Sequence, residues 1–201
     1  MSTDDIDPAS LARPAAPEDH LAPRADDNRA VRALRAIGRH ELAWCLHANR
    51  QLQRVWLRRL MTVTSRLGDG WVWGILIVGL WARGDRTIAV RMVFAGATST
   101  LAYMLVKTIL GRRRPCELGD DFHLPIAPLD RWSFPSGHTM HAVSLSAIAT
   151  AYYPGLAGGL VPFAGMIMIS RVLLGLHYPS DVLAGAVSGY LIAMLAVGLP
   201  L

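Results

Sequence analysis

Runs of apolar residues occupy most of the chain from residue 71 to its end. Short turns with charged residues, glycine or proline separate them, except for a polar loop over Gly111–Trp132 between the second and the third run. Four of the five runs have about the length that an α-helix needs to cross a bilayer. The runs are Trp71–Ala82, Ile88–Leu110, Pro135–Tyr153, Gly158–Leu176 and Asp181–Leu199. Because β-type alternation is weak throughout, the pattern predicts an all-α fold, a polytopic helical membrane protein with about five or six spans.

The first run is too short to cross a bilayer alone and reaches the necessary length only if it extends back to Leu60. That extension brings Arg66 and Asp69 toward the hydrocarbon, which is energetically costly. Trp71 and Trp73 at the start of the run are typical of the aromatic belt at a membrane surface. The last run contains many glycines and alanines, which allow helices to pack closely.

A different pattern precedes these runs. Residues 1–28 are rich in Pro, Ala and Asp without apolar periodicity, so we predict a disordered polar tail. Residues 29–66 carry nine arginines and a single acidic residue, Glu41. Their basic positions recur at helical spacing opposite an apolar face that includes Trp56, which indicates amphipathic helices at the membrane interface. The alternative is a solvated basic helix packed on the membrane-embedded domain that we predict over residues 67–201.

Composition supports a membrane protein and an anionic partner. Hydrophobic residues make up 52% of the chain and the mean hydropathy is +0.31, which is high for a soluble protein. From residue 29 onward, 18 basic residues stand against 8 acidic ones, a surplus that suits nucleic acid, lipid headgroups or an anionic substrate. The apolar runs favour the last two. Cys45 and Cys116 form neither a disulfide framework nor a metal-ligand pattern. The first residues lack a secretory signal, so we expect the internal runs to direct insertion.

Three polar clusters should meet on one side of the membrane. If the chain crosses the membrane at each run, three places share one side. These are the end of Ile88–Leu110, the start of Pro135–Tyr153 and the turn before Asp181–Leu199. That side collects Lys107, Arg114, His138, Arg171, His177 and Asp181. Ionisable residues beside hydrocarbon are costly and therefore suggest a function.

The first cluster suits an anion. Lys107, the one lysine of the chain, and Arg114 are seven residues apart, so both point the same way if the helix continues past Leu110. Arginine offers a planar fork of donors and lysine a point charge. The alternative is that these cations mark the headgroup boundary, and this is the interpretation we adopt for Arg112 and Arg113.

The second cluster, Pro135-Ser136-Gly137-His138, opens an apolar helix. Ser136 is a plausible N-cap, and Gly137 allows an oxyanion to approach a helix N-terminus with free N–H groups. A capped helix without further function is the alternative, but His138 in the first turn faces the other clusters. His141, one turn on, we interpret as packing or support.

The third cluster lies between Ser170 and Asp181. Pro179 disfavours helix at the residue before it, so His177 should end one helix and Asp181 begin the next. A neutral His177 oriented by that carboxylate is a nucleophile or a base. Arg171 adds a third positive group.

Together these residues resemble the type 2 phosphatidic acid phosphatase superfamily, which also contains acid phosphatases and vanadium haloperoxidases. The apolar runs resemble its bacterial membrane branch. The first part of its signature corresponds to Lys107, six residues and Arg114-Pro115, and the second to Pro135-Ser136-Gly137-His138. The third corresponds to Ser170-Arg171, five residues, His177, three residues and Asp181. The match covers residues 107–181 with their flanking helices and leaves residues 1–66 unexplained.

The resemblance implies hydrolysis of a lipid phosphomonoester or diphosphate through a phosphohistidine, without metal or cofactor. It implies that His177 attacks phosphorus, that Asp181 orients it, and that His138 protonates the leaving oxygen and then helps to activate water. The phosphoryl oxygens would be held by Lys107, Arg114, Ser136, Gly137 and Arg171. Among substrates we favour polyprenyl diphosphate, followed by phosphatidylglycerophosphate and phosphatidic acid.

Two other functions are weighed against this one. A catalytically silent protein could bind lipid headgroups with the same pocket, and residues 29–66 could bind nucleic acid, which nothing in the apolar runs requires. The oligomeric state stays open.

The resemblance places the site on the extracytoplasmic face of the cell (inner) membrane. Five spans would put the basic residues 29–66 on that same side, against the positive-inside rule. Either residues 41–70 hide another crossing or re-entrant segment, or the site faces the cytoplasm.

Overall fold

The computed structural model describes residues 29–118, 122–127 and 130–200, and the predicted tail over 1–28 lies outside them. Within these ranges all regular structure is helical, which confirms the predicted all-α class. The α-helices are α1 (Arg29–Arg50), α2 (Val55–Leu67), α3 (Trp71–Ala82), α4 (Arg86–Leu110), α5 (Gly137–Tyr152), α6 (Ala157–Leu173) and α7 (Pro179–Val197). Short 3₁₀ turns occupy Gln51–Gln53, Pro115–Glu117 and Pro154–Leu156.

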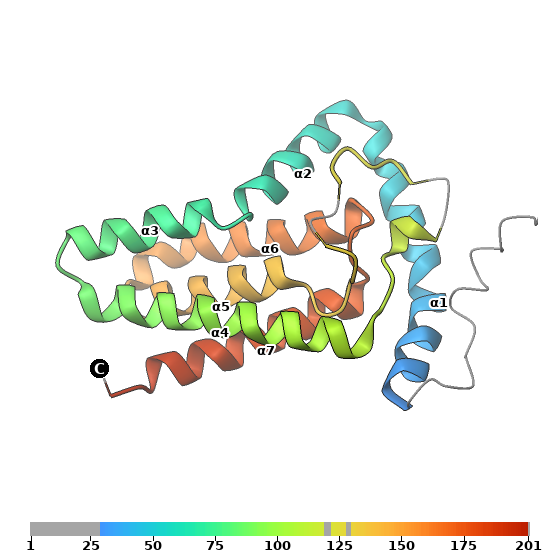
Figure 1. Cartoon of the computed structure of the whole chain (residues 1–201). Coiled ribbons are helices and arrows are strands. Elements are labelled where there is room, and N and C mark those ends of the chain that lie inside the picture. Colours follow the sequence, from blue (N-terminus) through green and yellow to red (C-terminus); the bar gives the residue numbers. More distant parts are fainter. Residues whose placement is uncertain (1–28, 119–121, 128–129, 201) are drawn as a thin grey trace, which may run out of the picture.

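Helices α3 to α7 run alongside one another as a bundle, and α1 lies across one end of it (Figure 1). Helix α5 is the centre, because it packs against α4, α6 and α7. Helix α2 slants away from the bundle toward α1 (Figure 1). The chain therefore enters the bundle with α3, and both basic helices lie at the end where α4 finishes and α5 and α7 begin.

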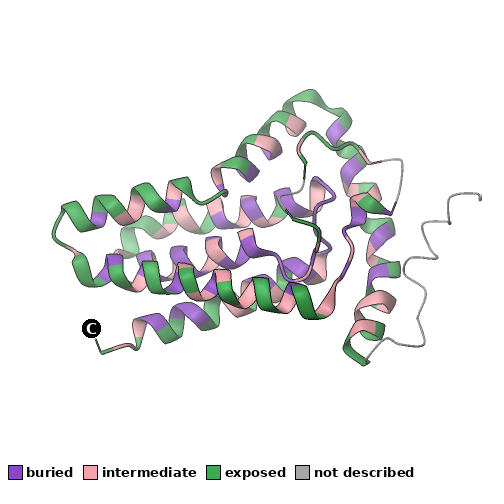
Figure 2. Ribbon diagram, viewed as in Figure 1, coloured by how far each residue is buried: buried purple, intermediate pink, exposed green. Residues whose placement is uncertain are grey.

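The outer surface of the bundle is apolar. Exposed residues follow the outward faces of its helices (Figure 2), and many are large hydrophobic side chains such as Ile75, Leu101, Ile169 and Leu191. An apolar surface of this extent suits contact with lipid. Three segments of the described chain are long and apolar enough to cross a membrane, namely Arg86–Glu117, Pro154–Leu173 and Pro179–Val197. The predicted five or six spans are thus matched only roughly, because α3 has 12 residues and α5 has 16.

The proposed extension of the first run back to Leu60 is wrong. The chain breaks at Gly68–Gly70, where Gly70 has a φ of +107°, a conformation that residues with a side chain rarely adopt. Helix α2 leaves the bundle at this corner, so Arg66 does not have to enter the hydrocarbon within a continuous helix. The same break places Asp69 at the end of α3 where the polar clusters gather. Neither α1 nor α2 provides the further crossing considered for residues 41–70.

Close packing of α7 on α5 depends on two glycines one turn apart. A Cβ on Gly185 would lie 2.6 Å from the carbonyl oxygen of Ser136, and a Cβ on Gly189 would lie 2.5 Å from that of Met140. Both distances are shorter than any normal contact. The glycines therefore let the backbone of α7 touch the beginning of α5, as the small residues of the last run predicted.

Replacing Gly189 by alanine should lower the thermal stability of the protein in detergent. The added methyl group meets the backbone of α5, so the helices must separate at a cost of about 1–3 kcal/mol. Gly165→Ala in α6 is the matched control, because a Cβ there has open space around it. Thermal unfolding of both variants checks this, and an equal Tm for the two would contradict the packing argument.

Candidate active site

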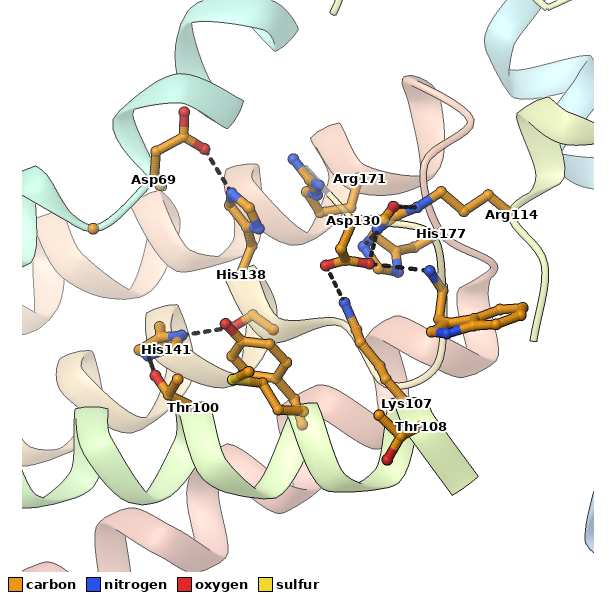
Figure 3. Close-up of a pocket in the computed structure, with 16 residues that line it drawn as sticks. Asp69, Thr100, Lys107, Thr108, Arg114, Asp130, His138, His141, Arg171 and His177 are labelled. Atoms are coloured by element: carbon orange, nitrogen blue, oxygen red, sulfur yellow. Dashed lines mark hydrogen bonds and ion pairs between the residues drawn. The ribbon is translucent and has the colours of Figure 1, made fainter. Parts of the chain in front are cut away.

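A cavity of about 550 Å³ opens at the end of the bundle that carries α1. Figure 3 shows the labelled side chains of this cavity converging from the α2–α3 corner, α4, the loop after it, α5, α6 and the α6–α7 turn. Six predicted site residues line it, namely Lys107, Arg114, Gly137, His138, Arg171 and His177. Ser136 and Asp181 lie fully buried behind the wall. The structure therefore brings together the three polar clusters, as predicted from the alternation of membrane crossings along the chain.

Lys107 and Arg114 meet, although not by the predicted route. Helix α4 ends at Leu110, and Gly111 turns the chain in the left-handed conformation with a φ of +54°. Arg114 then returns from extended backbone, so the continuous helix expected past Leu110 is wrong. Both side chains nevertheless bind one carboxylate, that of Asp130, from Lys107 Nζ at 2.7 Å and from Arg114 Nη2 at 2.8 Å.

Asp130 is thus a site residue that the sequence patterns did not reveal. Partial burial works against its charged form, but the hydrogen bonds and charges of Lys107 and Arg114 outweigh it and hold the pKa of this carboxyl below its ordinary value. A carboxylate bridging two cations occupies a position that a phosphate oxygen would also favour. Any anion that enters the cavity to reach both cations must displace Asp130.

Replacing Asp130 by asparagine should therefore strengthen the binding of inorganic phosphate about fivefold. The ion pairs of a half-exposed carboxylate are worth about 1 kcal/mol, and that competition disappears with the charge. Titration calorimetry on the detergent-solubilised protein measures the effect. Glu117→Gln removes the same charge from the same loop at a position outside the cavity wall and should leave phosphate binding unchanged. Weaker phosphate binding by Asp130→Asn would show that this carboxylate holds the cations in place instead.

His177 is held with its Nε2 atom turned toward the cations of the cavity. Its Nδ1 lies 2.7 Å from the carbonyl oxygen of Ser133 and therefore donates to it, while Nε2 accepts a hydrogen bond from Nη1 of Arg114 at 3.2 Å. Burial, and then the charges of Arg114, Arg171 and Lys107, lower the pKa of His177 well below its ordinary value of 6.5. The ring is therefore neutral, and its Nε2 carries a lone pair that faces the cationic end of the cavity.

Asp181 supports this arrangement from behind. One carboxylate oxygen lies 3.6 Å from Nδ1 of His177, which is longer than a hydrogen bond, and accepts the backbone N–H of Tyr178 at 2.8 Å. The carbonyl of Ser133 is therefore the direct acceptor for the imidazole, a partner that no side-chain motif could indicate. Asp181 contributes its charge beside the ring and caps the start of α7.

Arg112 corrects the expectation that it marks the headgroup boundary. Its side chain is buried and pairs with both Asp181 and Glu41, the latter at 2.9 Å. It also donates to Ser180 at 2.7 Å and lies 3.9 Å from the centre of the Tyr178 ring. A guanidinium with two carboxylates and an aromatic face is an internal structural group, here joining α1 to the start of α7.

His138 and Arg171 face each other across the cavity, as Figure 3 shows. His138 Nε2 lies 2.6 Å from Oδ1 of Asp69, and Nη1 of Arg171 donates to the hydroxyl of Ser65. The Nε atom of Arg171 is buried without a partner among the described residues. The α2–α3 corner thus supports two site residues, although the signature contains neither Ser65 nor Asp69.

Ser136 and Gly137 shape the start of α5. The Ser136 hydroxyl accepts from Thr139, as expected of an N-cap, and its backbone N–H donates to the carbonyl of Asp181 at 3.1 Å. A Cβ on Gly137 would lie 3.0 Å from the Tyr103 ring, so a larger residue would press on the cavity wall. His141 bonds to the carbonyl of Gly137 at 2.9 Å and to Thr100, consistent with a supporting role.

Similar proteins were found by sequence and by structure. Residues 88–200 match the model of the PAP2 superfamily. Phosphatidylglycerophosphatase B of Bacillus subtilis is 30% identical over 169 residues, 73% of this chain and 77% of that protein. Undecaprenyl-diphosphatase of Sulfolobus acidocaldarius is 27% identical over 146 residues, 70% of this chain and 69% of that protein.

Lipid A 1-phosphatase of Rhizobium johnstonii is 31% identical over 112 residues, which are 54% of this chain and 46% of that protein. The matched segment thus spans less than half the length of that relative. The crystal structure of Aquifex aeolicus LpxE shares the fold, with a TM-score of 0.71 at 24% identity over 79% of this chain and 95% of that one. With the family model covering more than half of the sequence, the chain belongs to the PAP2 superfamily.

Proposed function

We propose that the protein is an integral-membrane lipid phosphatase that hydrolyses a phosphomonoester or diphosphate through a phosphohistidine intermediate. One observation carries this proposal. Three cations, Lys107, Arg114 and Arg171, and two histidines, His138 and His177, line a single cavity at the end of an apolar bundle. Phosphoryl transfer depends mainly on positioning and on stabilising negative charge, and this cavity offers both.

The arrangement supports a two-step reaction. In the first step, Nε2 of His177 attacks phosphorus while the bond from phosphorus to the lipid oxygen breaks and His138 gives that oxygen a proton. In the second step, His138 takes a proton from water, the water oxygen attacks phosphorus, and the bond to His177 breaks to release phosphate. The three cations hold the phosphoryl oxygens throughout, and Ser133 with Asp181 keeps His177 in the reactive tautomer.

Polyprenyl diphosphate is the substrate that we propose first. Support comes from the undecaprenyl-diphosphatase relative, whose match extends over 70% of this chain. Phosphatidylglycerophosphate and phosphatidic acid are the next candidates, the former because of the Bacillus subtilis relative. The cavity wall beside Lys107 includes Tyr103, Met104 and Trp132, apolar side chains suited to the first carbons of a lipid.

Phosphate release from these three lipids, with EDTA present, tests the function. The purified protein in detergent should hydrolyse at least one of them without added metal, and vanadate should inhibit because it imitates pentacoordinate phosphorus. Headgroup binding without turnover would instead establish a silent lipid-binding protein. A loss of activity with chelator would contradict metal-independent chemistry.

The side of the membrane is decided by labelling. A cysteine introduced into the loop over 112–132 should react with an impermeant reagent added to intact cells if the site is extracytoplasmic, as we propose from the family resemblance. Protection of that cysteine would place the cavity in the cytoplasm, together with the arginines of α1 and α2.

A further inference from the structure

We propose that Asp69 is a positioning residue for His138. Its carboxylate holds the imidazole through Nε2, so that the ring presents a proton on its other nitrogen to the leaving oxygen of the lipid. This inference rests on the proposed function. It adds a residue that lies outside the three signature motifs and outside the segment matched by the family model.

The contact is close and joins a largely buried imidazole to an exposed carboxylate. The distance from Nε2 of His138 to Oδ1 of Asp69 is 2.6 Å, with 14% of the His138 side chain and 33% of the Asp69 side chain exposed. Figure 3 shows the edge of the ring that carries Nε2 turned toward Asp69, and the opposite edge turned toward Arg171 and His177. The nitrogen that is free of Asp69 thus lies on the side where the phosphoryl group would sit.

The corner that carries Asp69 is fixed to the bundle. A Cβ on Gly68 would lie 3.3 Å from the side chain of Ile167 in α6, so the corner packs directly on that helix. Ser65, one turn earlier in α2, accepts a hydrogen bond from Arg171 near the end of α6. Both contacts lie just before Asp69 in the chain and hold this corner against α6, so the position of Asp69 follows from the packing of α2 on α6.

The charges around His138 explain what its contact with Asp69 contributes to catalysis. The charged and titratable groups that act on His138 are Arg171 of α6, His177 of the following turn, His141 of α5 and Asp69. Burial and then the charge of Arg171 disfavour a protonated imidazole, and Asp69, the one anionic group among these, opposes both. A phosphomonoester such as phosphatidic acid releases an alkoxide, which leaves phosphorus poorly unless it is protonated. For such a substrate the acid must carry its proton beside a cationic pocket.

His138 loses one proton in the first step and regains one in the second. While the bond from phosphorus to oxygen breaks, the electron pair goes to the leaving oxygen, which takes the proton from the cavity-facing nitrogen of His138. Asp69 keeps the hydrogen bond to Nε2–H throughout. The neutral ring then accepts a proton from the attacking water and returns to the cationic form that Asp69 stabilises.

The leaving group provides the test. A short-chain phosphatidic acid has an alkoxide leaving group that needs protonation, whereas p-nitrophenyl phosphate releases a stable phenolate that does not. Asp69→Asn should lower kcat/KM for phosphatidic acid about 10- to 100-fold, within the range of general acid catalysis, and lower kcat/KM for p-nitrophenyl phosphate less than threefold. Asp85→Asn is the matched control, because Asp85 bonds to Tyr153 at the other end of the bundle.

A double-mutant cycle separates positioning from structure. If Asp69 acts through His138, Asp69→Asn should cause no further loss in a protein that already carries His138→Ala. Equal losses on both substrates, an additional loss in the His138→Ala background, or wild-type kinetics of Asp69→Asn on phosphatidic acid would each overturn the inference. If the wild-type protein hydrolyses neither substrate nor a polyprenyl diphosphate, the proposed function fails and this inference with it.

Discussion

Replacing His177 by alanine is expected to reduce the release of phosphate from lipid substrates by about 10⁴-fold or more. The side chain supplies the attacking atom, and removing a nucleophile eliminates the covalent route rather than weakening one contact. The rate with the preferred lipid phosphate in detergent, measured against a no-enzyme blank, checks this. A residual rate within about 100-fold of the wild type would contradict a phosphohistidine mechanism.

The matched control is His47→Ala, because His47 lies exposed on α1. It should retain wild-type turnover, which separates loss of the nucleophile from loss of a histidine in general. A phosphorylated protein trapped from the wild type by rapid quenching, and absent from His177→Ala, would identify the intermediate directly.

The largest effect on stability is expected for Arg112→Ala. Arg112 is buried between Asp181 and Glu41, and its removal leaves two carboxylates without their cation inside the protein. Breaking a buried ion pair from one side typically costs about 3–5 kcal/mol. Thermal unfolding in detergent should show a Tm far below that of Arg59→Ala, which removes an exposed arginine from α2.

A second change tests the cause. Adding Glu41→Gln to Arg112→Ala removes one of the two uncompensated charges and should recover part of the lost stability. Glu41→Gln alone should destabilise, because the carboxylate also accepts from the backbone and hydroxyl of Ser180 at the start of α7. Additive losses in the double variant would mean that the charges are not coupled.

The residues whose meeting could be predicted from the sequence belong to regular segments. The lengths of the apolar runs predict where the chain crosses the membrane. Because successive crossings alternate between the two sides, they also place Lys107, His138 and His177 at one end without any knowledge of the turns. The all-α class and the close packing of the last helix followed from the same patterns. What each side chain does in that cavity stays a prediction, for which the variants above provide the tests.

The residues that could not be predicted lie in segments without a regular repeat of apolar and polar positions. Asp130 and Ser133 belong to the irregular segment between α4 and α5, whose path is determined by Gly111 and by contacts with distant elements. Arg112 was interpreted, like Arg113, as marking the headgroup boundary, and only its neighbours in space show its structural role. Asp69 did give a signal, since a carboxylate within an apolar run is costly, but the corner that explains it could not be derived from hydropathy.

The position of α1 across the end of the bundle limits how far this protein can be shortened. Glu41 of α1 caps α7, and Asn49 binds both the loop at His123 and the last turn of α6 through the carbonyl of Leu173. Ser65 and Asp69 reach the cavity from outside the family-matched segment as well. A fragment over residues 88–200 would therefore contain every signature residue and still lack four side chains that support them. The family-matched segment is therefore shorter than the stretch of chain that supports the cavity.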